Sequence, residues 1–203
     1  MRYLYLVRHG YYDYNDERDP DVGKALVPLG VAQSRLLADR LQSLPHPFTA
    51  FYSSTMTRAR ETAYVIDEDM PELELIETER LRECIPPTWR EDVMAEDEAS
   101  EVEACQEQLE EAFAHFFVPS KNGDERDLIV AHGNVIRYFV ARALGVDPLA
   151  WLGMSVGNCS VTVIRVNADN TFKVLAVGDV GHLPPNMQTG WDATDHSLAV
   201  PQR

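Results

Sequence analysis

The stretch YLYLVRHGYYDYN, residues 3–15, joins an apolar run directly to an arginine, a histidine and a glycine. The run that ends at Val7 has the composition of a buried strand, and Arg8 and His9 follow it at once. For His9 alone, the simpler interpretation is a strand-end histidine that is hydrogen-bonded to the backbone. Its meaning therefore depends on what the rest of the chain brings to the same place.

Strand-like and helix-like segments alternate along the rest of the chain. We predict further strands at 48–54, 73–77 and 127–132, and a hairpin around the turn NADN within 159–179. We predict helices at 29–44, 55–67, 102–117 and 135–144. This alternation predicts an α/β fold, a three-layer sandwich in which a mostly parallel central sheet carries helices on both faces.

One domain is expected over residues 1–183. Within it, residues 82–99 are irregular, contain prolines and become strongly acidic, which predicts a surface insertion near the active site. Residues 184–203 are expected to form a loosely structured C-terminal tail. A homodimer is an open alternative to a monomer, and this tail is its candidate contact.

The charge balance limits the classes of partner. The chain has 203 residues and a formal net charge of -15 at pH 7. A surface that acidic repels nucleic acid and anionic membranes, so we expect neither as a partner. An anionic ligand would need positive charge that is concentrated in one pocket.

The cysteines and the start of the sequence bear on location. Cys84, Cys105 and Cys159 are odd in number and far apart, so we expect three reduced thiols rather than a disulfide framework or a zinc site. The strand-like run starts too early for a signal peptide, and no apolar stretch approaches the roughly 20 residues of a bilayer span. The expected location is the cytoplasm.

Polar side chains recur where the predicted strands end. In open parallel sheets, ligands bind beyond the carboxyl ends of the strands, so side chains at these ends are expected to converge. The residues concerned are Arg8, His9, Ser53, Ser54 and His132.

The convergent set has the chemistry of a phosphate site. Gly133 after His132 permits close backbone approach to a ligand, and the N-terminus of the helix that follows favours anions. The stretch SSTMTRARETA (53–63) adds Arg58 in the first turns of a helix, and guanidinium groups suit tetrahedral oxyanions. Two histidines, two arginines and a helix N-terminus therefore predict a phosphate-binding site.

Five pieces of the sequence resemble one known family in their order along the chain. They are LVRHG (6–10), Asn15 six residues beyond His9, SSTMTRARETA (53–63), LRE (81–83) and AHGNVIR (131–137). Together they resemble the histidine phosphatase superfamily, also called phosphoglycerate mutase-like. Within it, LRECIPP (81–87), GNCSVT (157–162) and GDVGHLPP (178–185) resemble the branch that contains the mitochondrial protein serine/threonine phosphatase.

The resemblance implies a role for each matching residue. His9 would be the nucleophile that accepts the phosphoryl group, in its neutral form and with its other ring nitrogen held by a backbone carbonyl. Arg8, Arg58 and His132 would neutralise the phosphoryl oxygens. Glu83 would be the general acid and then the base that activates water, which requires a pKa above the usual value of about 4.3.

Several assignments stay open at this point. Asn15 is a candidate substrate ligand together with Arg8, Arg58 and Gly133, but tyrosines around it replace the usual acidic-hydroxyl pair of the family. Tyr12 either lines the pocket or packs beneath the loop. Arg60 and Glu61 are interpreted as solvated helix charges. Arg82 and Arg137 form either surface ion pairs or a layer of positive charge behind the phosphate ligands, and His182 has no assigned chemistry.

The implied activity is phosphomonoester hydrolysis through a phosphohistidine on His9, without a cofactor and without a metal. The substrate would be a phosphoserine or phosphothreonine protein or a small phosphoester. Two alternatives are a cofactor-dependent mutase-type phosphotransferase and a non-catalytic protein that binds a phosphorylated ligand. The stretch after Glu83 offers few cations to hold the carboxylate of a triose, which favours the hydrolase.

Overall fold

The fold is built on one six-stranded sheet with the strand order β3-β2-β4-β1-β5-β6. The structure is a computed structural model that describes residues 1–13, 24–94 and 99–191. The strands are β1 (Arg2–Arg8), β2 (Ala50–Ser54), β3 (Leu75–Thr78), β4 (Glu125–Ala131), β5 (Val161–Val166) and β6 (Phe172–Asp179).

The sheet is mostly parallel. Strands β3, β2, β4 and β1 run parallel to one another, β5 is antiparallel to β1, and β6 is antiparallel to β5. The hairpin turn uses Asn170 at a positive φ of 62°, a conformation that asparagine tolerates better than most residues. The predicted fold class is thereby confirmed.

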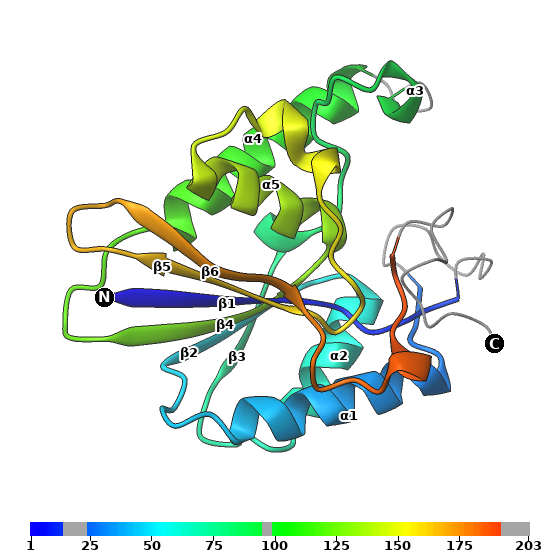
Figure 1. The fold of residues 1–203 in the computed structure, drawn as a ribbon, viewed down its shortest axis with the longest axis vertical. Coiled ribbons are helices and arrows are strands. Elements are labelled where there is room, and N and C mark those ends of the chain that lie inside the picture. The colour runs from blue at the N-terminus through cyan, green and yellow to red at the C-terminus, as the bar shows by residue number, and fades with distance from the viewer. Residues whose placement is uncertain (14–23, 95–98, 192–203) are drawn as a thin grey trace.

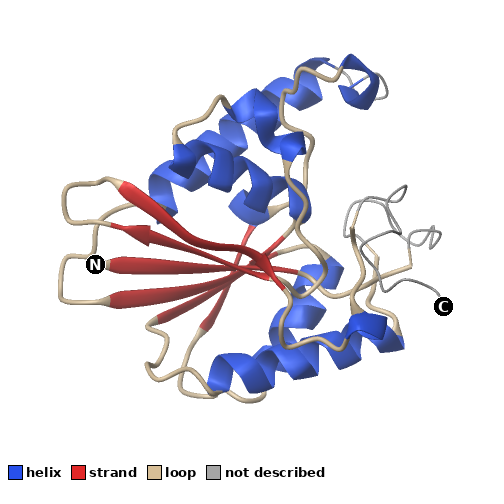
Figure 2. Cartoon of the chain, viewed as in Figure 1, coloured by secondary structure: helices blue, strands red, loops and turns tan. Residues whose placement is uncertain are grey.

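Helices cover both faces of the sheet, as Figures 1 and 2 show. On one face lie α1 (Pro28–Gln42) and α2 (Thr57–Asp67), and on the other α4 (Ala99–Phe116) and α5 (Gly133–Leu144). The short helices are α3 (Glu91–Met94), η1 (Glu79–Leu81), η2 (Pro148–Gly153) and η3 (Pro185–Met187). None of the described helices combines the length and apolar character that a bilayer span requires.

Each face of the sheet has its own apolar core. Leu37, Phe51 and Ile66 belong to the core under α1 and α2, and Leu109 and Phe139 to the core under α4 and α5. Burial on both faces explains why β4 reads as a continuous apolar run rather than an alternating one.

The register brings three strand ends to one edge of the sheet. Arg8 pairs with Ala131 and Ser53 with Val130, so β1, β2 and β4 end side by side. Arg8 is the last residue of β1, Ser54 the last of β2, and His132 follows β4. The expected convergence of strand ends is confirmed.

The segment after β3 and the C-terminal segment both pack on the body of the protein. Residues 82–90 contain no regular element, and the indole N–H of Trp151 donates to the carbonyl of Pro87 at 3.0 Å. Residues 184–191 run past α1, where Gln33 donates its amide to the carbonyl of Met187 at 2.6 Å. The proposed boundary of the domain at residue 183 stays a prediction.

The expectation of three reduced thiols is wrong. Cys84 and Cys105 form a disulfide, with their Cα atoms 5.7 Å apart, while Cys159 is a buried free thiol. The reason is the packing of the segment after β3 against α4, which joins residues 21 positions apart. Such a pairing leaves no local spacing in the sequence that could announce it.

Candidate active site

His9 is held at both ring nitrogens. It is 1% exposed, and its Nδ1 lies 2.8 Å from the carbonyl oxygen of Gly10. Because a carbonyl only accepts, Nδ1 carries the proton of the neutral ring and Nε2 keeps its lone pair. Nε2 faces the guanidinium of Arg58, whose Nε donates to it at 3.1 Å.

The surroundings of His9 favour its neutral form. Burial lowers its pKa well below the usual 6.5, and the charges of Arg58, His132 and Arg8 lower it further, against the carbonyl of Gly10. A neutral imidazole whose Nε2 carries no proton is the state that a nucleophile needs. The hydrogen bond to Gly10 therefore sets the expected tautomer, with the proton on Nδ1 of His9.

Thr62 connects the two sides of His9. Its hydroxyl accepts from the backbone N–H of Gly10 at 2.9 Å and donates to the carbonyl of Arg58 at 2.7 Å, and the residue is fully buried. One side chain on α2 therefore bonds both to Gly10, the residue whose carbonyl orients Nδ1, and to Arg58, the residue that faces Nε2.

Arg8 reaches across the site to the C-terminal segment. Its Nη1 donates to the carbonyls of Val156 and Gly190, both at 2.6 Å. A Cβ on Gly133 would lie 3.5 Å from the Arg8 guanidinium, so the first residue of α5 lies directly against it. A contact of Gly133 with substrate stays a prediction.

His132 lies beside His9 at the start of α5. The two ring centroids are 5.1 Å apart, and His132 Nε2 is 2.8 Å from the hydroxyl of Ser54. Its Nδ1 is buried and has no hydrogen-bond partner within the described part of the chain. Burial and the charges of Arg58, Arg8 and Arg82 lower its pKa well below 6.5. The structure therefore brings together Arg8, His9, Arg58 and His132.

Glu83 approaches the same site from the segment after η1. The backbone N–H of Asn134, the second residue of α5, donates to its Oε1 at 3.2 Å. Burial raises the pKa of Glu83, and the charges of Arg58, Arg8 and Arg137 oppose that rise. The direction is the one that a general acid requires.

A cavity of about 470 Å³ lies between Glu83 and α4. Arg58 and Met56 line it near the sheet, and Glu101 and Val102 line it on α4. Arg58 is the sole cation among its described lining residues. The cavity is therefore suited to a leaving group without a carboxylate of its own.

Sequence reasoning missed two residues that hold the site. Besides Thr62, the buried Asn158 donates its side-chain amide to the carbonyl of His9 at 3.0 Å. Both stand inside stretches that carry the resemblance, 53–63 and 157–162, but nothing local marks them as contacts of His9. The role of Tyr12, for which the sequence leaves two positions open, is settled by its contacts. Its ring centroid is 5.3 Å from that of His9, and Arg58 lies over the ring at 4.8 Å, so Tyr12 lines the site.

The remaining candidates lie beside the site, away from it, or outside the described residues. Asn15 lies outside the described residues. Arg60 forms an exposed ion pair with Glu77 at 3.0 Å, while Glu61 accepts from the backbone of Leu26. His182 lies 3.0 Å from Arg40, which also pairs with Asp179, and burial next to Arg40 lowers the His182 pKa to about 4. Arg137 lies over the ring of Trp151 and donates to the carbonyl of Gly133.

Comparison with known proteins decides the family. A family model described as the histidine phosphatase superfamily (branch 1) matches residues 4–179. The chain belongs to the histidine phosphatase superfamily. The match includes all five residues for which the sequence predicts a catalytic role.

Curated relatives confirm the expected branch. The serine/threonine-protein phosphatase Pgam5, mitochondrial, of Caenorhabditis elegans is 39% identical over 194 residues, which are 91% of this chain and 65% of the relative. Relatives from Xenopus tropicalis and human carry the same name. The chain thus spans somewhat less than two thirds of the length of that Caenorhabditis relative.

Solved structures agree with the fold. Bacillus stearothermophilus YhfR has a TM-score of 0.72 and 26% identity, with 90% of this chain and 99% of that chain covered. The phosphoglycerate mutase from Plasmodium falciparum has a TM-score of 0.64 and 28% identity, with 90% and 94% covered. A phosphoglycerate mutase therefore shares this architecture.

The expectation of a cytoplasmic protein is contradicted. The curated relatives are named mitochondrial phosphatases. The expectation depended on reduced cysteines and on the start of the sequence, but two of the cysteines form a disulfide and the chain matches only part of these relatives. Neither argument therefore bears on location.

Proposed function

We propose that this protein hydrolyses phosphomonoesters through a phosphohistidine on His9. The observation that supports this most is the state of His9: a buried neutral ring, with Nδ1 on the Gly10 carbonyl and the Nε2 lone pair facing Arg58. A histidine held in this way has one unprotonated nitrogen, Nε2, that can form a covalent bond. The family membership supports the same reaction.

In the first step, Nε2 of His9 attacks phosphorus while the bond from phosphorus to the leaving oxygen breaks. The proton of Glu83 passes to that oxygen, so the product leaves as a neutral alcohol and Glu83 becomes a carboxylate. Arg8 and Arg58 neutralise the charge of the phosphoryl oxygens, and His132 binds them. Because Arg58 is buried and Arg8 is half-buried, water screens their charges less than it would at the surface.

In the second step, the Glu83 carboxylate takes a proton from water as the water oxygen attacks phosphorus. The bond from phosphorus to Nε2 breaks, which returns His9 to its neutral form and releases inorganic phosphate. Every group involved belongs to the protein, and the described residues hold no cluster of three or more His, Cys, Asp or Glu side chains placed to bind a metal ion. The proposed hydrolysis needs no metal, so the rate should survive EDTA.

The proposed substrate is a phosphoserine or phosphothreonine protein, and a small phosphoester is the second candidate. The names of the curated relatives support the first. The net charge of -15 disfavours strongly acidic phosphopeptides, although salt screens that repulsion beyond about 8 Å. The cavity beside Glu83, with Arg58 as the sole cation among its described lining residues, supports hydrolysis over the mutase alternative.

Rapid-quench mixing with a phosphate-labelled substrate tests the proposal. We expect a burst of label on His9 that is lost in acid and retained in base, and we expect none in His9→Ala. His46→Ala is the matched control, because His46 is exposed and lies outside the family motifs, and its burst should be unchanged. Label on a serine, cysteine or aspartate, or tight binding of phosphate without any burst, would refute the hydrolase.

A further inference from the structure

The segment that carries Glu83 is held from both sides. On the α5 side, the backbone of Asn134 donates to the Glu83 carboxylate at 3.2 Å, and the Asn134 side-chain amide donates to the carbonyl of Cys84 at 2.9 Å. The contacts on the α4 side are of another kind, and the reaction steps above do not use them.

Helix α4 holds the segment at the residues immediately before and after Glu83. The amide of Gln108 donates to the carbonyl of Arg82 at 2.9 Å, and Cys105 forms the disulfide with Cys84. A hydrogen bond and a covalent bond from one helix therefore flank the residue that is proposed to donate the proton.

The disulfide also lies where α4 leaves the core. Cys105 is 3% exposed, while residues 99–104 before it are exposed or half-buried. The α4 side chains that line the cavity beside Glu83 belong to this end of the helix, and they are Glu101, Val102, Ala104, Cys105 and Gln108. The attachment to Cys84 therefore also fixes how far this wall of the cavity stands from Glu83.

We propose that the Cys84–Cys105 disulfide and Gln108 are positioning groups for Glu83, and that reduction of the disulfide selectively weakens proton donation to the leaving group. The inference depends on the proposed function, because it assigns these groups to the general-acid step. His9, Arg8 and His132 are positioned by other contacts, so the nucleophile should stay competent when the disulfide opens.

The chemistry of opening is ordinary thiol–disulfide exchange. Cys84 lines the cavity and is half-buried, so a thiol of an added dithiol can attack its sulfur. The attack forms a mixed disulfide and releases Cys105 as a thiol, and the second thiol of the reagent then displaces Cys84. The protein gains two electrons and two protons as two thiols, and the dithiol becomes a cyclic disulfide. Cys159 is buried and its pKa is raised to about 12, so its thiol should not take part.

Counting thiols and comparing two leaving groups provides the test. Unfolded oxidised protein should show one free thiol, and reduced protein three. Single-turnover burst rates are then measured with phenyl phosphate and 4-nitrophenyl phosphate, which share a ring and differ in how much the departing oxygen needs a proton. Reduction should slow phenyl phosphate by about tenfold, a part of the roughly 10²–10⁴-fold that general acids supply, and change 4-nitrophenyl phosphate by less than about twofold.

A second variant shows whether the effect passes through Glu83. In Glu83→Gln, reduction should leave both rates unchanged, because the acid on which the disulfide acts is already absent. Reoxidation of the wild type should restore the phenyl phosphate rate. This reversible cycle uses the native chain, so it remains decisive if Cys84→Ser fails to fold.

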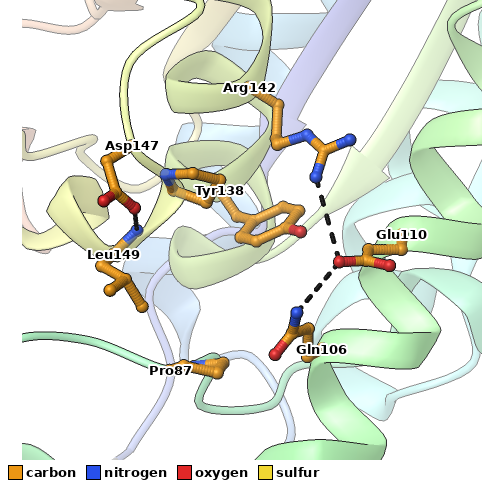
Figure 3. Close-up of a pocket in the computed structure, with 8 residues that line it drawn as sticks. Pro87, Gln106, Glu110, Tyr138, Arg142, Asp147 and Leu149 are labelled. Carbon is orange, nitrogen blue, oxygen red and sulfur yellow. Dashed lines mark hydrogen bonds and ion pairs between the residues drawn. The ribbon is translucent and has the colours of Figure 1, made fainter.

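Helix α4 also offers a matched control for Gln108. Gln108→Met removes the donor and keeps the length of the side chain, so it should reproduce the selective loss with phenyl phosphate. Gln106→Met makes the same change two residues away, where Gln106 bonds to Glu110 and lines a different pocket with Tyr138 (Figure 3). Its rates should match those of the wild type.

Three outcomes would overturn the inference and leave the hydrolase in place. They are three free thiols in the oxidised protein, an equal loss with both substrates on reduction, and a further loss on reduction of Glu83→Gln. A wild type that forms no phosphohistidine with either substrate would instead overturn the proposed function itself.

Discussion

Replacing Thr62 by valine should damage both stability and catalysis, because one hydroxyl links the two groups that hold His9. The hydroxyl accepts from the N–H of Gly10 at 2.9 Å and donates to the carbonyl of Arg58 at 2.7 Å. Gly10 supplies the carbonyl for His9 Nδ1, and Arg58 faces Nε2. Valine has almost the same shape as threonine, so the change removes the hydrogen bonds and leaves the packing in place.

The size of the effect follows from which group loses its partner. The Arg58 carbonyl still receives the helical N–H of Thr62 four residues later, so its loss is small. The Gly10 N–H is buried and would lose its acceptor, which costs about 1–3 kcal/mol. A loss of about 2 kcal/mol should lower the midpoint of thermal unfolding by about 4–8 °C in a domain of this size.

The catalytic effect should exceed what stability alone predicts. If Gly10 shifts when its N–H loses this acceptor, its carbonyl, which sets the tautomer and direction of His9, shifts as well. Small displacements of a reacting group cost up to roughly 10²-fold, so phosphorylation of His9 should slow by about 10- to 100-fold in single-turnover experiments at 25 °C, where the variant is still folded.

Thr62→Ser is the matched control, because it keeps the hydroxyl and loses only the methyl group. It should phosphorylate His9 at close to the wild-type rate. A valine variant that melts and reacts like the wild type would refute the link between Gly10 and Arg58. A serine variant as slow as valine would show that the methyl packing matters and the hydroxyl does not.

Two further predictions concern charge. First, kcat/KM should rise with pH as His9 loses its proton, and this acidic limb should lie below pH 6.5 because the His9 pKa is lowered. It should fall again as Glu83 loses its proton, and this alkaline limb should lie above pH 4.5 because the Glu83 pKa is raised. A pH profile of Glu83→Gln should lack the alkaline limb; a profile unchanged from wild type would contradict the assignment. Second, Arg58→Ala should lower the rate by several orders of magnitude, more than the roughly 10²–10³-fold of a single oxyanion donor, and move the acidic limb to higher pH, since the Arg58 charge lowers the His9 pKa. Wild-type rates in rapid-quench assays would place Arg58 outside the reaction.

The sequence was sufficient for the features that depend on local pattern. Apolar runs ending in Arg8–His9, in Ser53–Ser54 and in His132 predict strands, and parallel pairing then forces their ends together. Four of the five predicted catalytic side chains are therefore collected by the sheet or by the first turn of α2. Glu83 follows the short helix η1, and its motif rather than any periodicity identified it.

What the sequence could not show depends on contacts between distant segments. The Cys84–Cys105 pairing, the amide of Asn158 on the His9 carbonyl, and Gly190 on Arg8 join segments that no period or spacing relates. The composition of the tail suggests a loose structure, but its residue Gly190 provides the carbonyl that accepts from Arg8. The sequence could not show this contact, because every residue has a backbone carbonyl.

The same two arginines favour the required state of the nucleophile and oppose the required state of the general acid. Arg58 and Arg8 lower the pKa of His9, which keeps the nucleophile neutral, and they also pull down the pKa of Glu83, which opposes its protonation. Burial is the cause that raises the pKa of Glu83 against them. Water that reached Glu83 would therefore lower its pKa and leave it without the proton that it donates, while His9 remained neutral and reactive. Proton donation in particular therefore requires that the Glu83 segment stays packed between α4 and α5. Changes at its two attachments to α4, the Gln108 hydrogen bond and the Cys84–Cys105 disulfide, should affect this step most.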